Sequence, residues 1–357
     1  MPQVAPACHI AWGAQALWEQ LVGVLPGLSV EVVARISSTN SALLDRARVA
    51  SGALGEDNHD NHDNHANEDT NEDANGHANG HANDAALVKR STESRAFGRR
   101  AVDLQPCLLV AEHQTAGRGR HGRHWHASAG SSLTFSLGLT LDPPDWSGLS
   151  LAVGVALAEA LDPVGRSLNP RLCIKWPNDL WLMDTNADTT AHTSADANAE
   201  LSPCRAGAGR KVGGVLIETV ASGAKRLVVV GVGLNVLPMG LNAAQASTGT
   251  ACLQELNPEL DAPTALAWLA LPLVTALHEF ERSGFAPFAE RFAARDLLYQ
   301  RRITTTQVGV LEGVAQGVSV SGALKVQTPT GLHWLSSGEV SVRPMISSSD
   351  LAEGKPC

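Results

Sequence analysis

The stretch AGRGRHGRHWHASAGSSLTFSL, residues 116–137, joins a glycine- and arginine-rich loop to a run with the alternation of a β-strand. Arg118, Arg120 and Arg123 lie among glycines that let a ligand approach the backbone closely. Planar guanidinium groups suit carboxylates and phosphates. The stretch therefore predicts a flexible, anion-binding loop that leads into a strand. Taken alone, it also fits an RNA-binding segment or a solvated turn.

The positive loop stands in an acidic chain, and the acidity has a local origin. The 357 residues carry a net charge of −9, and the segment EDNHDNHDNHANEDTNEDANGHANGHAND at 56–84 holds nine acids and no Lys or Arg. The rest of the chain is therefore close to neutral. Because this tract has almost no apolar side chains, it predicts a disordered insert over about 52–98. We interpret its histidines as solvated, with transition-metal binding as the alternative.

Outside that tract, strand and helix patterns alternate along the chain. A second polar insert, rich in Ala, Thr, Asp and Asn, is predicted at 184–210. Strands are predicted at 29–36, 106–114, 131–140, 171–183, 211–220 and 226–236. Helices are predicted at 37–50, 148–164 and 263–298, the last interrupted around Pro272 and Pro287. Short strands punctuated by glycine follow over 300–345, so we expect an α+β domain with a small appended β-barrel.

Several classes of protein are excluded by what the chain lacks. No apolar stretch approaches the roughly 20 residues of a membrane helix, and no secretory signal is evident, so we expect a cytoplasmic protein without membrane contact. The six cysteines form no CxxC pair, and the adjacent Cys8 and His9 are the only cysteine and histidine within five residues of each other, which argues against a zinc site and for reduced thiols. A P-loop is excluded because GxxxxGK[ST] is absent.

Further motifs give the loop a context. KWPNDLWL (175–182) and KVGGVLIE (211–218) each begin with a lysine on a strand-like segment. Singly, Lys175 and Asp179 could form a weak surface ion pair, and the glycine pair could mark a bulge. The ordered series SSTN, EHQTAGRGRHGRHW, KWPNDLWL, KVGGVLIE and GVGLNV, however, resembles the biotin protein ligases. The resemblance covers about Val33 to Pro344, apart from the inserts.

The resemblance implies a fold and a reaction. The fold would be a mixed-sheet biotin/lipoate ligase-type catalytic domain over 1–298, a small C-terminal β-barrel over 299–346 and a flexible tail over 347–357. The enzyme would join biotin to ATP, giving biotinyl-5'-AMP and pyrophosphate, and then transfer biotin to one lysine of a biotin carboxyl carrier domain. Both steps develop negative charge in a site that must exclude water. A cationic loop that closes over the ligand would meet both needs.

The resemblance also implies site residues. Biotin contacts are implied for Ser38, Thr39, Asn40, Gln114, Gly117, Arg118, Gly119, Arg120, Lys211 and Gly214. Nucleotide contacts are implied for Arg118, Arg120, Arg123, Trp125, Lys175, Asn178, Lys211 and Asn235. A core role for Trp125 and a turn role for Asn235 remain open. Mg²⁺ is expected with ATP, and the sequence shows no metal site formed by the protein itself.

Four of these residues are implied in catalysis. Lys211 would face the developing charge on the α-phosphate, and Arg118 would hold the biotin carboxylate and α-phosphate in attack geometry. Asp179 would orient or deprotonate the incoming lysine, and Lys175 would support the phosphate site.

The sequence before Ser38 departs from the bifunctional members of the family. Only 37 residues precede Ser38, with Arg35 as their one Lys or Arg, so a DNA-binding module of several tens of residues does not fit. We therefore expect a monofunctional ligase that binds no DNA, as a monomer or homodimer. The alternatives are a lipoyl or octanoyl transferase of the same fold, a biotin-responsive repressor and an RNA-binding protein.

Overall fold

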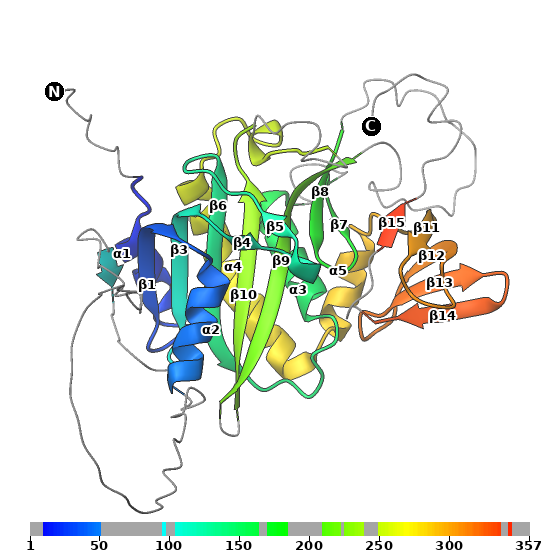
Figure 1. Ribbon diagram of the computed structural model, residues 1–357, viewed down its shortest axis with the longest axis horizontal. Coiled ribbons are helices and arrows are strands. Elements are labelled where there is room, and N and C mark those ends of the chain that lie inside the picture. The colour runs from blue at the N-terminus through cyan, green and yellow to red at the C-terminus, as the bar shows by residue number, and fades with distance from the viewer. Residues whose placement is uncertain are drawn as a thin grey trace, which may run out of the picture.

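An eight-stranded mixed sheet forms the centre of the molecule (Figure 1). The computed structural model describes residues 10–50, 95–97, 104–163, 170–184, 209–222, 225–238, 249–336 and 342–344. The sheet order is β2-β1-β3-β6-β10-β9-β8-β7. Its strands are β1 (Ser29–Ile36), β2 (Arg95–Phe97), β3 (Cys107–Gln114), β6 (Ser132–Leu141), β7 (Leu172–Lys175), β8 (Asp179–Met183), β9 (Gly209–Ser222) and β10 (Lys225–Asn235). Only β1 and β3 pair in parallel among these neighbours, which confirms the predicted mixed sheet.

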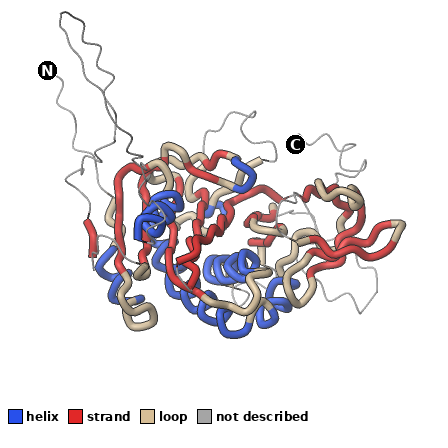
Figure 2. The backbone as a smooth tube through the Cα atoms, turned by 60° about the horizontal axis from the view of Figure 1, so that its bottom comes forward, coloured by secondary structure: helices blue, strands red, loops and turns tan. Residues whose placement is uncertain are grey.

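Helices cover both faces of this sheet (Figures 1 and 2). One face carries α2 (Thr39–Ala50), and the other carries α1 (Ala14–Leu21), α3 (Leu149–Leu161) and α4 (Ala262–Ser283), with α5 (Ala289–Ala293) beside α3. Strand alternation supplies both interfaces, because successive side chains point to opposite faces. In β3, Leu109 belongs to the cluster under α2, whereas Leu108 and Val110 belong to the larger core that includes α3 and α4.

The C-terminal part is a five-stranded antiparallel sheet in the order β14-β13-β12-β11-β15. Its strands are β11 (Arg302–Thr305), β12 (Glu312–Val318), β13 (Leu324–Thr328), β14 (Gly331–Leu335) and β15 (Val342–Pro344). Over the described residues β14 and β15 are its two edges, where the sequence predicted a small barrel. Ile303 and Leu324 lie in the same core as α3, and buried Trp176 donates its indole N–H to Gly322 O at 3.0 Å. The two sheets therefore share one core.

Two predicted elements differ from the structure. The segment 171–183, predicted as one strand, is the hairpin β7–β8, whose turn contains a cis Trp176–Pro177 peptide bond. The predicted interruption at Pro272 is wrong, because α4 continues through it, although the helix does end before Pro287. Leu269, Leu273 and Val274 are buried on this helix, and their packing offsets the hydrogen bond that proline cannot donate.

The predicted inserts also need correction at their ends. Arg95–Phe97 forms β2 against β1, inside the insert predicted over 52–98. Asp184 and Arg210, predicted as part of the second insert, form an ion pair at 2.7 Å, and β9 already begins at Gly209. The remainder of both inserts and the predicted tail at 347–357 lie outside the described residues.

Two further expectations concern cysteines and membranes. Cys107 and Cys252 are free and buried. The expectation of reduced thiols is wrong at Cys173, which is disulfide-bonded. Within the described part of the chain, no helix combines the length and apolar character needed to cross a membrane.

Candidate active site

A cavity of about 320 Å³ opens on the face of the sheet that carries α2. Strand β10 explains why it lies there. Leu227 and Val229 pack beneath α2, but Gly231 and Gly233, the next two residues on that face, have no side chains and leave space above the sheet. The glycines of GVGLN therefore form part of the cavity floor.

The predicted site residues converge on this cavity. All those named above for biotin, nucleotide and catalysis line it, except Gly117. Gly117 instead pairs with Trp125 between β4 (Gly117–Arg118) and β5 (His124–Trp125). A Cβ at Gly117 would lie 2.4 Å from Trp125 O, so glycine is needed for this close pairing. Gly117 shapes the loop and does not line the cavity.

One end of the cavity is polar and uncharged. The Gln114 side-chain oxygen accepts from the Thr39 backbone N–H at 2.8 Å and from the Thr39 hydroxyl at 3.2 Å. Ser136 Oγ lies 2.6 Å from both Thr39 Oγ1 and Asn40 Oδ1. All four side chains are buried. Buried amide and hydroxyl groups held in fixed orientations are suited to a ligand with several hydrogen-bonding atoms.

The glycine- and arginine-rich loop predicted from the sequence, Gly117 to Trp125, is a small folded hairpin in this structure and is called the Gly-Arg loop below. Gly119 N–H donates to Arg123 O at 2.7 Å, and a short helical turn, Arg120–Gly122, forms its tip. His121 adopts φ 55° and Gly122 φ 69°, the left-handed region that the tight turn requires. Its residues Arg118–Trp125 line the cavity, apart from Gly122.

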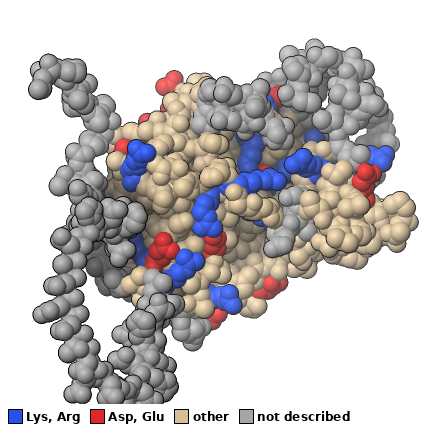
Figure 3. All heavy atoms as spheres, viewed as in Figure 1, with Lys and Arg blue, Asp and Glu red and all other residues tan. Residues whose placement is uncertain are grey.

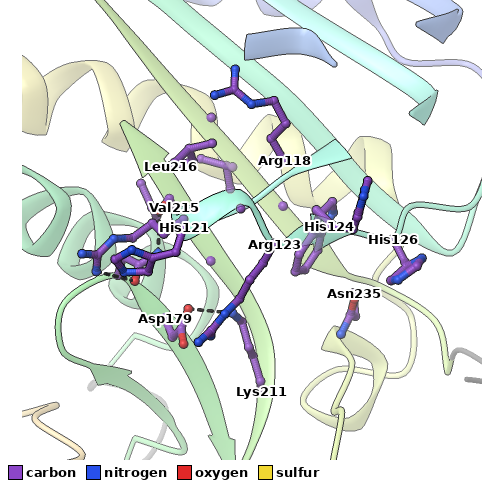
Figure 4. A pocket seen from close by; sticks show the side chains of 18 of the residues that line it. Arg118, His121, Arg123, His124, His126, Asp179, Lys211, Val215, Leu216 and Asn235 are labelled. Atoms are coloured by element: carbon purple, nitrogen blue, oxygen red, sulfur yellow. Dashed lines mark hydrogen bonds and ion pairs between the residues drawn. The ribbon is translucent and has the colours of Figure 1, made fainter. Parts of the chain in front are cut away.

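The other end of the cavity is strongly cationic (Figures 3 and 4). Asp179 is the one carboxylate among the described residues that line the cavity, and it accepts from Lys211 Nζ at 2.6 Å. Lys175 Nζ lies 3.9 Å from the same carboxylate. The cations at this end are Arg120, Arg123, Lys175, Lys211 and Arg343. Arg118 also lines the cavity, but it is bonded to Ser41 and Glu218 beside Asn40. This excess of positive charge suits a polyphosphate.

Burial alters two of these cations. Desolvation lowers the pKa of Lys175, Asp179 opposes this shift, and repulsion from Lys211 adds to it. Desolvation also lowers the pKa of Arg120, whose guanidinium donates to Asn178 Oδ1 at 3.4 Å. An anionic ligand would relieve the cost of holding these charges close together and partly out of water.

Trp125 and Asn235 each present a buried polar atom beside the cavity. The Trp125 ring packs against Gly233, where a Cβ would lie 2.5 Å from it. Trp125 Nε1 and Asn235 Oδ1 have no hydrogen-bond partner within the described residues. Asn235 Nδ2 donates to Ala251 O at 3.1 Å, so this side chain also holds the returning chain. Both residues line the cavity.

Lys211 is fixed through its backbone and through its neighbour. Ala251 N–H donates to Lys211 O at 2.9 Å. Arg210 donates to Thr250 O at 3.0 Å and forms an ion pair with Glu255 at 2.5 Å. Hydrogen bonds to Glu255 and, to a smaller extent, to Asp184 raise the pKa of Arg210. These contacts anchor the segment that follows Asn235 next to the lysine.

The glycine pair in KVGG does lie beside an irregularity of pairing. The register between β8 and β9 shifts between Leu180 and Trp181, as the bulge alternative predicted. A Cβ at Gly213 would lie 2.3 Å from Gly233 O, and Gly214 faces Asp179 and Lys211. The pair therefore allows close backbone approach at the cavity floor.

Three residues at the site were not predicted from the sequence. Ser136 faces the cavity side of β6, and the alternation of SSLTFSL, with its polar residues on one face, was an available signal. Glu218 ends the KVGGVLIE motif and forms an ion pair with Arg118 at 2.7 Å. Arg343 enters from β15 of the C-terminal sheet, and no local pattern indicated that it would reach the cavity.

Comparisons with known proteins agree with this geometry. The model of the Biotin/lipoate A/B protein ligase family matches residues 90–235, and that of the Biotin protein ligase C terminal domain matches 301–343. Biotin protein ligase from Aquifex aeolicus in complex with biotin and ATP is 26% identical with a TM-score of 0.52, and the match covers 67% of this chain and 89% of that one.

Two curated relatives extend the comparison. The bifunctional ligase/repressor BirA of Escherichia coli (strain K12) is 31% identical over 239 residues, 66% of this chain, and the chain spans only 65% of that relative's length. The biotin--[acetyl-CoA-carboxylase] ligase of Paracoccus denitrificans is 30% identical, and the match covers 67% of this chain and 94% of that protein. With both characteristic domains matched and nearly the whole of one relative covered, this chain belongs to the biotin protein ligase family.

Proposed function

We propose that the protein is an ATP-dependent biotin ligase that forms biotinyl-5'-AMP, releases pyrophosphate and transfers biotin to a lysine of a carrier domain. The observation that carries the proposal is the division of one cavity into two ends. Buried amide and hydroxyl groups lie around Asn40, next to the Arg118–Glu218 ion pair, and an excess of cations lies around Lys211. A small ligand with a polar ring and a carboxylate tail would span from one end toward the other. Nucleotide phosphates would occupy the cationic end.

The residues would divide the work as follows. Thr39, Asn40 and Gln114, already oriented by hydrogen bonds, would bind the ring of biotin. Arg118 would hold the carboxylate against the α-phosphate. Lys211, fixed by Asp179 at 2.6 Å, would stabilise charge on the α-phosphate as the carboxylate oxygen attacks. Asp179 would also orient the incoming lysine amine and accept its proton during transfer.

Mg²⁺ would enter with the nucleotide in this proposal. The described residues contain no group of three His, Cys, Asp or Glu side chains arranged for a metal ion, so phosphate oxygens and water would supply most ligands. The unpaired Asn235 Oδ1 is a neutral oxygen of the kind that Mg²⁺ accepts. The cation would neutralise phosphate charge.

The proposal includes a partner, an organisation and a location. The partner is the biotin carboxyl carrier domain of a biotin-dependent carboxylase, and the domain limits are 1–298 and 299–346. The proposal includes a monofunctional enzyme without DNA binding, and α1, whose buried Leu17 and Leu21 belong to the main core, is part of the catalytic domain. We place the enzyme in the cytoplasm, where ATP is available.

The test combines the purified chain with biotin, Mg-ATP and a carrier domain. We expect biotin-dependent pyrophosphate release and a streptavidin-reactive carrier, and no product when lipoate replaces biotin. Lys211→Ala should abolish pyrophosphate release while the melting temperature stays near that of the parent, whereas Lys325→Ala, outside the cavity, should behave as the parent. No product from the parent would overturn the proposal, and normal release by Lys211→Ala would remove that residue from catalysis.

A further inference from the structure

Glu218 connects two parts of the site that lie far apart in the sequence. Its carboxylate accepts from Arg118 Nη2 at 2.7 Å and from Asn40 Nδ2 at 3.0 Å. The side chain is 22% exposed, and it lies on the same face of β9 as Gly214 and Leu216. One half-buried carboxylate thus holds the Gly-Arg loop and the start of α2 together.

The hydrogen bonds continue from Asn40 into the uncharged end of the cavity. Ser136 Oγ lies 2.6 Å from both Asn40 Oδ1 and Thr39 Oγ1 and can donate its one proton to either, and the Thr39 hydroxyl donates to Gln114 at 3.2 Å. A continuous series of contacts therefore runs from the loop arginine to the residues proposed to bind the ring of biotin. Any ligand that reorients Asn40 must also alter the surroundings of Glu218.

Arg118 has a second partner, and it retains donors for a substrate. Its Nη1 donates to Ser41 Oγ at 3.2 Å, so Ser41 and Glu218 fix the plane of the guanidinium from two sides. In Figure 4 this side chain points away from Asp179 and Lys211. A guanidinium has more N–H groups than these two bonds use, so a carboxylate can bind beside Glu218.

We infer that Glu218 is a positioning residue: it holds Arg118 and Asn40 in a common arrangement and so couples the filling of the biotin end to the position of the Gly-Arg loop. This inference rests on the proposed function. Arg118 would not have to be ordered when the substrate arrives, which lowers the entropic cost of binding the adenylate. Glu218 itself touches no reacting atom in this scheme.

The contact contributes little to folding. Arg118 is 47% exposed, and ion pairs at such exposure have small effects on stability. The effect of losing the carboxylate should therefore be seen in adenylate retention and not in the melting temperature. This separates a positioning role from a structural one.

The test uses Glu218→Gln in the full chain. The substitution keeps the size and an oxygen acceptor for Asn40 but removes the charge that faces Arg118. We expect an unchanged melting temperature, biotinyl-adenylate dissociation about tenfold faster, and increased biotinylation of bystander proteins. Glu159→Gln is the matched control, because Glu159 pairs with Arg291 at 2.6 Å at similar exposure, away from the cavity, and it should leave dissociation unchanged.

Two further variants show whether Glu218 acts through Arg118. In the Arg118→Gly background, Glu218→Gln should add little to the dissociation rate, because its target is already absent. Ser41→Ala removes the other partner of Arg118 and leaves the Asn40 contact intact, so it should speed dissociation without weakening biotin binding.

The results separate this inference from the function on which it rests. A parent that releases no pyrophosphate would overturn the proposed function and the inference together. An active parent, with adenylate retention unchanged in Glu218→Gln, would overturn the inference alone. Fully additive effects of the Glu218 and Arg118 substitutions would do the same.

Discussion

Gly231 and Gly233 offer a way to disturb the two ends of the cavity separately. They lie on one face of β10, and a Cβ at Gly231 would fall 2.1 Å from Asn40 Oδ1, whereas a Cβ at Gly233 would fall 2.5 Å from the Trp125 ring. Gly231→Ala should therefore impair biotin binding, and Gly233→Ala should impair ATP binding. Each change adds one methyl group to the floor.

The size of each effect follows from these contacts. Carbon atoms pack at about 3.5 Å or more, so either neighbour must move by roughly 1 Å. Asn40 is buried and bonded to Leu216 O, Glu218 and Ser136, and it cannot move without breaking some of these bonds. Overpacking of this kind costs about 1 to 3 kcal/mol. If that cost opposes one ligand, its affinity should fall about 5- to 150-fold.

The assay is biotin-dependent pyrophosphate release, with each substrate varied in turn, together with direct titration of biotin. Gly154→Ala is the control, because a Cβ there would make an ordinary contact of 3.5 Å with Ile174. It should leave both KM values unchanged. If Gly231→Ala and Gly233→Ala raised the KM of the same substrate, or if the two effects were exchanged, the assignment of the cavity ends would be refuted.

Three other changes probe the anchoring contacts and the core. Arg210→Gln should raise the KM for ATP about fivefold, and an unchanged KM would contradict a role of Arg210 in anchoring the site. The loss of stability should be about 1 kcal/mol or less, because the ion pair with Glu255 is about one-third exposed. Trp176→Phe should lower the free energy of unfolding in urea by about 1 to 3 kcal/mol, because Gly322 O loses a buried donor, and an unchanged midpoint would argue against the shared core. Burial raises the pKa of Cys107 from 9.0 to about 12, so the folded state keeps a proton that the unfolded state loses. Stability from this group should be complete below pH 9 and fall by about 1.4 kcal/mol per pH unit above it, a slope that Cys107→Ala should reduce in urea titrations at pH 8 to 10.5.

The sequence predicted strands well where alternation or apolar runs were long. Ser29–Ile36 forms a strand with the predicted limits, and the strand predicted at 226–236 differs by one residue at each end. The hairpin at 171–183 was missed because apolar residues continue on both sides of a three-residue turn, and the pattern alone does not show a reversal. At Pro272 a break was predicted where the helix continues, because burial of the surrounding helix outweighs the low helix propensity of proline.

The site was predicted best where one short motif supplied the residue. The SSTN, Gly-Arg, WPND and KVGG segments each carry side chains that line the cavity. Ser136 and Glu218 were missed because their partners lie on other elements, and neither residue type is unusual in a strand. Arg343 was missed because its place depends on how the C-terminal sheet packs on the first, which no local pattern encodes.

The shared core has a consequence for dissecting the molecule. A fragment that ended before β11 would lose Arg343 from the cavity and would leave the buried indole N–H of Trp176 without its acceptor. The segments before and after this boundary should therefore fold poorly as separate proteins but should associate when both are present. On association, the C-terminal segment would restore Arg343 to the cavity and apolar side chains to the core. Recovered ligase activity would therefore show that the two segments had reassembled.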